Sequence, residues 1–324
     1  MICFAQKEYI FPLGSVTPSC HASTVLPLAD GSVLAAWFGG RYEKHGSVEI
    51  YTSIRSENGQ WSAPTCVSEN DAVPHWNPVL HLRRDGTIQL YYKYGYEVED
   101  WITKYVTSAD GGLTWSAPRE LVPGDRSGGR GPVKNKCLQT KSGLLIAPAS
   151  TEQNDLWLPF MDLSYDDGIT WQKTPLMERA KYKGANVHLI QPTLWEDSAG
   201  GIHCFMRSDK GAVYRSDSAD GGYTWKKPGR TRIPNNNSGL DCCTDHKNRL
   251  WLVYNPVKEN WGVRYPLTLA CLNEDGKNLR DMLVLEPGPG EFSYPAIAYN
   301  DNTLHITYTH KRKQIVYWKI NLEE

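Results

Sequence analysis

Short runs of alternating apolar and polar residues, separated by turn residues, fill the chain from one end to the other. Six of these runs follow a turn rich in Gly, Asp, Asn or Ser: Asp30–Leu34, Asp85–Leu90, Ser142–Ile146, Gly200–Phe205, Lys247–Leu252 and Asp301–Ile306. Each is preceded by another apolar run, which is the pattern of a β-hairpin. No segment shows a convincing helical period over about ten residues. The pattern therefore predicts an all-β chain.

A second motif, S-x-D-x-G-x-T-W, recurs between the hairpins. Intact copies span Ser108–Trp115, Ser164–Trp171 and Ser218–Trp225, and degenerate copies begin at Ser56 and Leu272. In such a turn the Asp accepts hydrogen bonds from backbone N–H groups ahead of it, the Gly supplies a positive φ, and the Trp packs as the strand resumes. The five starts lie 52, 56, 54 and 54 residues apart. This regularity indicates a repeat architecture.

A unit of about 54 residues that holds four short strands fits one blade of a β-propeller, and a chain of 324 residues holds six such units. The sequence thus predicts one domain over residues 1–324, an all-β, six-bladed β-propeller of four-stranded antiparallel blades. No copy of the repeated motif follows the last unit. Its strand Ile315–Trp318 is expected to pair with Tyr9–Phe11 and so close the ring.

Composition narrows the classes of partner. The formal net charge is −1 and no block of like charge occurs, so no global field favours nucleic acid. No apolar run reaches the ~18 residues of a membrane span. The 12 Trp and 18 Tyr far outnumber the 6 Phe, and aromatics with a polar group are typical of turn plugs and sugar-binding surfaces. We expect a partner chosen by a local site.

The eight cysteines show no C-x-x-C spacing and fit small core residues, so the sequence predicts neither a metal site nor a cofactor. Residues Met1–Lys7 are similar to the end of a secretory signal but lack a charged n-region and a full apolar core. We expect no complete signal peptide in this sequence. The compartment stays open, with a secreted or periplasmic location as one alternative.

In a propeller the innermost strands begin at one mouth of the central channel, so residues at the same phase of each unit converge there. Ten residues before the hairpin glycines stand His21, Trp76 and Gln191. The second strands return to the same mouth, and they end near Arg41, Glu152, Arg207 and Tyr254. With His75, Asn77 and Lys136 these residues predict a cationic pocket, which selects an anionic ligand.

The repeated motif resembles the Asp box of the sialidase (neuraminidase) superfamily, whose members are six-bladed propellers. The resemblance implies a Tyr nucleophile activated by a Glu, an Asp acid/base and three arginines that hold a carboxylate. Arg207 and Arg264 resemble the second and third arginines. Tyr294, in the segment Glu291–Ile297, resembles the nucleophile.

Three positions depart from that pattern. His21 stands where the first arginine is expected, the segment Glu43–Ser47 contains no Asp, and Gln191 stands where the Glu is expected. Histidine can act as an acid or base near neutral pH and can bind a carboxylate when protonated. His45, Glu43 or Glu49 is therefore the candidate acid, and Glu291 or Glu152 the candidate group that activates Tyr294.

Three functions stay open at this point. The first is an exo-acting glycoside hydrolase that releases a terminal acidic sugar, sialic acid or a related 2-keto-3-deoxy acid, from a glycan or oligosaccharide. The second is a uronate-specific polysaccharide lyase with a Tyr/His pair, a reading that the missing carboxylates favour. The third is a propeller that binds acidic glycans without cleaving them.

Overall fold

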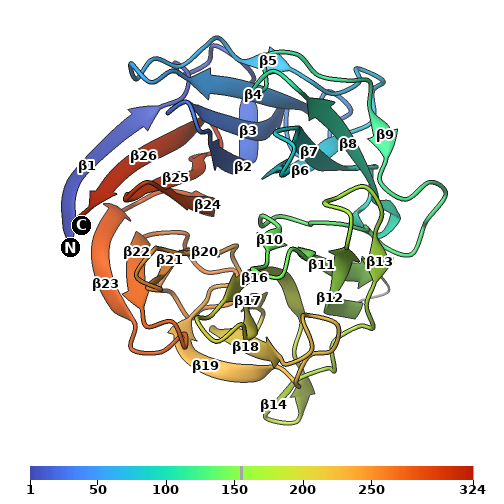
Figure 1. Cartoon of the computed structure of the whole chain (residues 1–324), viewed down its shortest axis with the longest axis vertical. Coiled ribbons are helices and arrows are strands. Elements are labelled where there is room, and N and C mark those ends of the chain that lie inside the picture. The colour runs from blue at the N-terminus through green and yellow to red at the C-terminus, as the bar shows by residue number, and fades with distance from the viewer. Residues whose placement is uncertain (154–155, 324) are drawn as a thin grey trace.

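Six four-stranded antiparallel sheets stand like blades around a central channel (Figure 1). The computed structural model describes residues 1–153 and 156–323. Blade 1 holds β2 (Ser19–Pro27), β3 (Val33–Gly40), β4 (Glu49–Arg55) and β5 (Thr65–Cys66); blade 2 holds β6 (His75–Leu82), β7 (Ile88–Tyr94), β8 (Ile102–Ser108) and β9 (Arg119–Glu120); blade 3 holds β10 (Leu138–Gln139), β11 (Leu145–Gln153), β12 (Leu156–Ser164) and β13 (Gln172–Lys173).

The second half of the ring repeats this order. Blade 4 holds β16 (Leu189–Glu196), β17 (Ile202–Ser208), β18 (Ala212–Ser218) and β19 (Gly229–Pro234); blade 5 holds β20 (Asp241–Thr244), β21 (Leu250–Tyr254), β22 (Leu267–Leu272) and β23 (Arg280–Glu286); blade 6 holds β24 (Phe292–Asn300), β25 (Thr303–His310), β26 (Gln314–Leu322) and β1 (Ile2–Tyr9). Outside the blades lie the hairpin of β14 (Lys181–Tyr182) and β15 (Ala185–Asn186) and a short 3₁₀ helix η1 (Val98–Asp100). The predicted fold class is confirmed.

The first strand of the chain closes the ring. β1 is the outer strand of blade 6 and pairs antiparallel with β26, with Tyr9 opposite Val316 and Lys7 opposite Trp318. The two chain ends therefore lie side by side, as Figure 1 shows. This confirms the predicted pairing of Ile315–Trp318 with the N-terminal segment. No helix of the described residues is long and apolar enough to cross a membrane.

The three intact S-x-D-x-G-x-T-W turns share the same pattern of hydrogen bonds. In the third copy, the Ser218 hydroxyl donates to Asp220 Oδ1 at 2.8 Å, and Asp220 accepts hydrogen bonds from the backbone N–H of Thr224 at 2.9 Å and from its hydroxyl at 2.5 Å. The carboxylate is thus fully engaged inside its own turn. The turns follow the third strand of a blade at the end remote from the start of its first strand, so they are structural.

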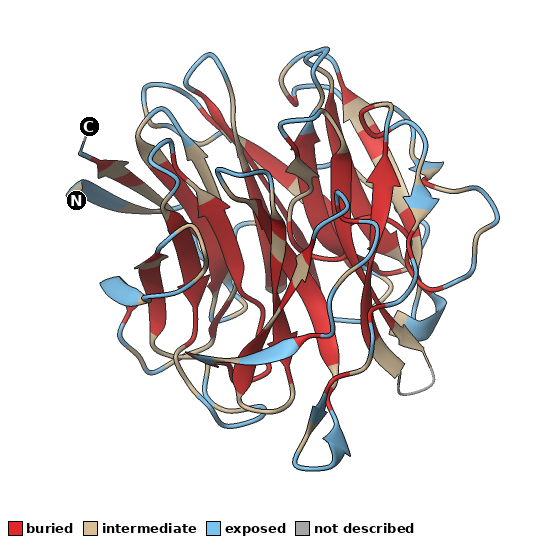
Figure 2. Ribbon diagram, turned by 60° about the horizontal axis from the view of Figure 1, so that its bottom comes forward, coloured by how far each residue is buried: buried red, intermediate tan, exposed pale blue. Residues whose placement is uncertain are grey.

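Apolar side chains fill the space between neighbouring blades. Figure 2 shows that the strands are buried along most of their length, while the exposed residues gather in the loops. Trp37, Trp195 and Trp251 are at most 1% exposed. Large aromatic side chains of this kind bury enough area to hold neighbouring blades together.

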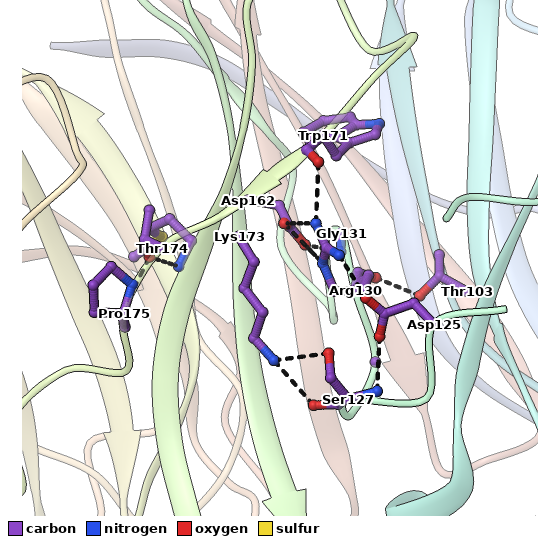
Figure 3. Close-up of polar contacts among 12 residues, drawn as sticks. Thr103, Asp125, Ser127, Arg130, Gly131, Asp162, Trp171, Lys173, Thr174 and Pro175 are labelled. Atoms are coloured by element: carbon purple, nitrogen blue, oxygen red, sulfur yellow. Dashed lines mark hydrogen bonds and ion pairs between the residues drawn. The ribbon is translucent and has the colours of Figure 1, made fainter. Parts of the chain in front are cut away.

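Blade 3 differs from the expected pattern because its inner edge is an irregular segment and β10 has two residues. A buried ion pair fixes the preceding loop (Figure 3): Arg130 Nη2 donates to Asp162 Oδ1 at 2.6 Å, and the backbone N–H of Gly131 donates to Asp162 Oδ2 at 2.6 Å. Arg130 also donates to Asp125 at 2.7 Å. Side-chain contacts here replace a strand ladder, and they bring residues 132–137 to the channel.

Candidate active-site pocket

A pocket of about 380 Å³ opens at one mouth of the channel, and every blade contributes to its lining. Eight of the predicted site residues lie in this lining: His21, Trp76, Asn77, Glu152, Gln191, Arg207, Arg264 and Tyr294. Repeat phase predicted all of them except Arg264, because the first and second strands of each blade meet at the same mouth, and Arg264 was predicted from the resemblance to the sialidase family. Among the residues that line the pocket, two are carboxylic acids, Glu43 and Glu152.

Four inner strands carry the same irregularity at the mouth. In β2, β6, β16 and β24 two residues oppose a single residue of the next strand, which is a β-bulge. The first bulged residue has a positive φ each time: 52° at Ala22, 43° at Asn77, 53° at Gln191 and 52° at Tyr294. Such a backbone costs about 1–3 kcal/mol per residue and is typical of functional sites. In three of these strands the next residue is proline. The Asn-Pro, Gln-Pro and Tyr-Pro pairs could therefore have indicated the positions of these bulges from the sequence.

Arg207 connects the two central polar residues of the pocket. Its Nη1 donates to the phenolic oxygen of Tyr294 at 3.0 Å and to Gln191 Oε1 at 3.3 Å. Its Nε donates to Asn237 Oδ1 at 2.7 Å, which fixes the plane of the guanidinium. The Gln191 amide donates to the same phenolic oxygen at 3.1 Å. Two donors thus point at this oxygen and can stabilise negative charge on it.

A third arginine, Arg312, completes the cationic side of the pocket, and sequence reasoning missed it. Glu291 Oε1 accepts hydrogen bonds from Arg264 Nη1 at 2.8 Å and from Arg312 Nε at 2.9 Å, so one carboxylate orients two guanidinium groups. Arg312 also donates to Glu43. It lies in the turn between β25 and β26, just beyond the strand end at His310 where the predicted ring of residues stopped.

His21 lies under the nucleophile candidate, with 4.2 Å between the ring centroids of His21 and Tyr294. The histidine is 2% exposed. Burial lowers the pKa of His21 well below its usual value, and the nearby cations, Arg312 first among them, lower it further. A neutral imidazole cannot take the place of a carboxylate-binding cation. Arg312 is the cation at this side of the pocket, and a role of His21 in binding a carboxylate stays a prediction.

Glu152 and two tryptophans occupy the rim. Burial raises the pKa of Glu152, and the charge of Arg207 offsets part of this effect. A carboxylate with a raised pKa is a stronger base than an exposed one. Trp157 and Trp261 also line the pocket, and Trp261 is 60% exposed with its ring centroid 5.4 Å from Arg207 Cζ.

Three residues predicted at the pocket are held elsewhere. His75 is fully buried between blades 1 and 2, where its Nδ1 contacts the Val48 carbonyl at 3.0 Å. Lys136 forms an ion pair with Asp241 at 2.9 Å inside the channel. The Tyr254 hydroxyl donates to Asp281 at 3.0 Å within blade 5. Each side chain is satisfied away from the mouth, so its predicted place in the pocket was wrong.

The loop after β3 also differs from the expectation. Arg41 is exposed and His45 packs against Tyr42, with 4.9 Å between the two ring centroids, and neither lines the pocket. Glu43 and Lys44, which stand between them, do. Glu49 is buried and accepts a hydrogen bond from Ser68. Glu291 lies behind Arg264 and Arg312 instead of beside the phenol. Glu43 and Glu152 are therefore the carboxyl groups available to a bound ligand.

Comparisons with known proteins agree with the fold. The family described as "BNR repeat-like domain" matches residues 31–306. A crystal structure of a protein of unknown function from Dyadobacter fermentans superposes with a TM-score of 0.80 at 15% identity and covers 99% of this chain and 100% of that one. A Hadza microbial sialidase gives 0.81 at 15% identity, covering 98% and 68%. Trypanosoma rangeli sialidase in complex with the inhibitor DANA gives 0.75 at 14%, covering 98% and 60%.

No curated protein matches the sequence. Structural similarity at these sequence identities shows the architecture alone. The reaction has to be inferred from the residues of the pocket. Among the described residues no group of three or more His, Cys, Asp or Glu side chains is placed to hold a metal ion.

Proposed function

The chain belongs to the BNR repeat-like domain family, and on that premise we propose that it is an exo-acting glycoside hydrolase that releases a terminal acidic sugar, sialic acid or a related 2-keto-3-deoxy acid, from a glycan. The observation that carries this proposal is the arrangement of Arg207, Arg264 and Arg312 around Tyr294 in one pocket. Guanidinium groups bind a carboxylate through paired hydrogen bonds. A phenol is suited to attack beside that carboxylate because it carries no charge of its own before the reaction.

Each step of the reaction can be assigned to a residue in the lining. The three arginines hold the sugar carboxylate and so place the anomeric carbon over Tyr294. The phenolic oxygen forms a bond to that carbon while the glycosidic C–O bond breaks. The phenolic proton passes to Glu152. The Glu43 carboxyl, released from its ion pair when Arg312 turns to the sugar carboxylate, gives a proton to the leaving oxygen. Water then attacks the anomeric carbon, loses a proton to Glu43, and the bond to Tyr294 breaks as the phenol regains its proton.

The charges and hydrogen bonds around Tyr294 support these roles. The donors from Arg207 and Gln191 stabilise charge that develops on the phenolic oxygen. The raised pKa of Glu152 makes it an effective acceptor for the phenolic proton. Gln191 can orient the phenol but cannot take its proton, so the base must be another residue.

The substitution Tyr294→Phe tests the proposal. We expect the variant to fold like the wild type, to bind an acidic monosaccharide, and to lose release of the aglycone from a panel of sialosides and ketodeoxy sugar glycosides. Tyr254→Phe is the matched control, because it makes the same Tyr-to-Phe change and removes a phenolic hydroxyl that lies outside the pocket. Turnover by Tyr294→Phe at the wild-type rate would eliminate Tyr294 as the nucleophile.

One observation favours a second candidate, a uronate lyase. Neutral His21 lies against Tyr294, and its Nδ1 has no hydrogen-bond partner among the described residues. In that reaction the arginines neutralise a uronate carboxylate, His21 takes the C5 proton, and Tyr294 protonates the leaving oxygen. The product carries a new C4–C5 double bond, so the ultraviolet absorbance of an unsaturated uronide separates elimination from hydrolysis.

A further inference from the structure

Two polar side chains lie inside the channel, directly beneath the pocket. Lys134 and Asn135 are 3% and 1% exposed. They belong to the irregular inner segment of blade 3, which the Arg130–Asp162 contacts hold in place (Figure 3). Neither of them lines the pocket. Burying an ammonium group and an amide is costly unless they find partners, so their contacts show what they stabilise.

Both side chains donate to backbone carbonyls behind the pocket: Lys134 reaches across the channel, and Asn135 reaches to the neighbouring blade. Lys134 Nζ donates to the carbonyl of Pro295, in blade 6. Asn135 Nδ2 donates to the carbonyls of Gln191 and Pro192, in blade 4, both at 3.0 Å. Lys134 Nζ also donates to Asn135 Oδ1 at 2.7 Å, which joins the two side chains into one unit.

These carbonyls belong to the two bulges whose first residues meet over Arg207. Tyr294 and Gln191 both have a positive φ, near 52–53°, a region that non-glycine residues rarely occupy without outside support. Their side chains nevertheless meet with 3.1 Å between the Gln191 amide and the phenolic oxygen. A ladder of backbone hydrogen bonds cannot supply that support, because a bulge interrupts it.

We propose that Lys134 and Asn135 are positioning residues, a cross-channel strut that fixes the Tyr294 and Gln191 bulges so that both side chains point at the same place in the pocket. The catalytic consequence rests on the proposed function, in which Tyr294 attacks the sugar. The structural statement does not depend on it.

The ammonium of Lys134 also acts on the pocket through its charge. Its Nζ lies 5.9 Å from the ring centroid of Tyr294, close enough to stabilise negative charge on the phenol. Burial lowers the pKa of Lys134 to about 7, and the ionisable groups that face it are Asp241, Lys136, Arg207, Cys242 and His21. Below this pH the strut carries its charge. Above it Lys134 is neutral, so we expect the rate of the wild-type protein to fall as the pH rises through about 7.

The substitution Lys134→Met tests the strut, and Lys93→Met is the control variant. Lys93 is an equally buried lysine: its Nζ donates to the carbonyls of Gly129 at 3.1 Å and Arg130 at 2.7 Å, and burial lowers its pKa to about 7 as well. It does not line the pocket. It anchors the loop that precedes the Lys134 segment, so Lys93→Met controls for the loss of a buried ammonium and of that anchoring while the Lys134 contact to Pro295 is kept. We expect both variants to lose thermal stability to a similar degree. Lys134→Met alone should lower kcat, by about 100-fold as expected for a small misplacement of a reacting group, with KM little changed and the high-pH fall in rate abolished.

Crystal structures of the variants give a readout that needs no activity. In Lys134→Met we expect the Tyr294 hydroxyl to leave Arg207, and in Asn135→Ala we expect the Gln191 amide to leave Tyr294. Asn135→Ala also keeps the test available if Lys134→Met does not fold. Unmoved Tyr294 and Gln191 side chains in these structures, or an equal loss of kcat in Lys93→Met, would overturn the strut. Displaced side chains in a protein that hydrolyses no acidic glycoside would leave the strut standing and refute the proposed function instead.

Discussion

Arg312 offers the sharpest test of the cationic pocket, because sequence reasoning did not find it. The substitution Arg312→Ala removes one of the three guanidinium groups that we propose to hold the sugar carboxylate. It also leaves Glu43 and Glu291 without a partner that now neutralises both. Both effects weaken the binding of an anion, and neither should weaken the binding of a neutral sugar.

The expected size follows from the contacts. A hydrogen bond to a charged group contributes about 1.5–3 kcal/mol, which corresponds to about a 10- to 150-fold change in Kd. The Arg312 side chain is 29% exposed, so solvent screens part of its charge. We therefore expect a loss in the lower half of this range, about 10- to 50-fold. Arg312→Lys should fall between Arg312→Ala and the wild type, because lysine keeps the charge and loses the paired geometry.

Titration calorimetry with N-acetylneuraminate and with its methyl ester measures both effects. The acid should bind Arg312→Ala more weakly by the factor above, while the ester should bind the variant and the wild type alike. Lys313→Ala is the control, since Lys313 is the next residue of the same turn and donates to the Pro18 carbonyl instead. An unchanged Kd for the acid, or equal losses for acid and ester, would refute the assignment of Arg312 to the carboxylate.

Three further predictions concern Glu152, His305 and Asp220. Glu152→Gln should remove the fall of kcat on the acidic side, since the proposed base Glu152 can accept a proton only above its raised pKa; a pH profile of kcat measures this. Burial lowers the pKa of His305 to about 4, so its contribution to stability is present above about pH 6.5 and is lost as the pH falls toward 4; His305→Gln should flatten this loss in urea unfolding curves taken across that range. Asp220→Ala should cost about 2 kcal/mol in urea unfolding and leave kcat/KM unchanged, because its carboxylate serves only its own turn.

The architecture could be predicted because each blade repeats the same local physics. A turn residue, an alternating strand and an Asp-Gly-Thr-Trp turn recur at a constant spacing, and that spacing fixed the number of blades. The same phase placed His21, Gln191 and Tyr294 around one mouth. In blades 1 and 2 the bulge lies one residue beyond the predicted position, so Ala22 and Asn77 have the positive φ instead of His21 and Trp76.

The parts of the pocket that could not be predicted from the sequence depend on contacts between distant segments. Arg312 enters the pocket from a hairpin turn, and its partner Glu43 lies 269 residues earlier in the chain. His75, Lys136 and Tyr254 stand at suitable phases, but each finds a carboxylate or carbonyl partner away from the mouth. Which of two polar residues reaches the pocket depends on packing across blades, and periodicity within one blade cannot show it.

This chain has His21 in the first inner strand, where the sialidase pattern has an arginine, and it has Arg312 in the last hairpin turn. We expect substitutions at these two positions to be coupled in their effect on ligand affinity. The resemblance to sialidases places an arginine where His21 stands, and the backbone of Arg312 lies beside it, with 3.0 Å between the Cys20 N–H and the Arg312 carbonyl. An arginine at both places would crowd two cations into a buried space, so His21→Arg alone should destabilise the protein. In Arg312→Ala the space and the charge deficit are both present, so His21→Arg added there should recover part of the lost affinity for N-acetylneuraminate. The Kd values of the two single variants and the double variant measure the coupling. If the double variant bound N-acetylneuraminate no more tightly than Arg312→Ala, the two positions would not serve the same carboxylate.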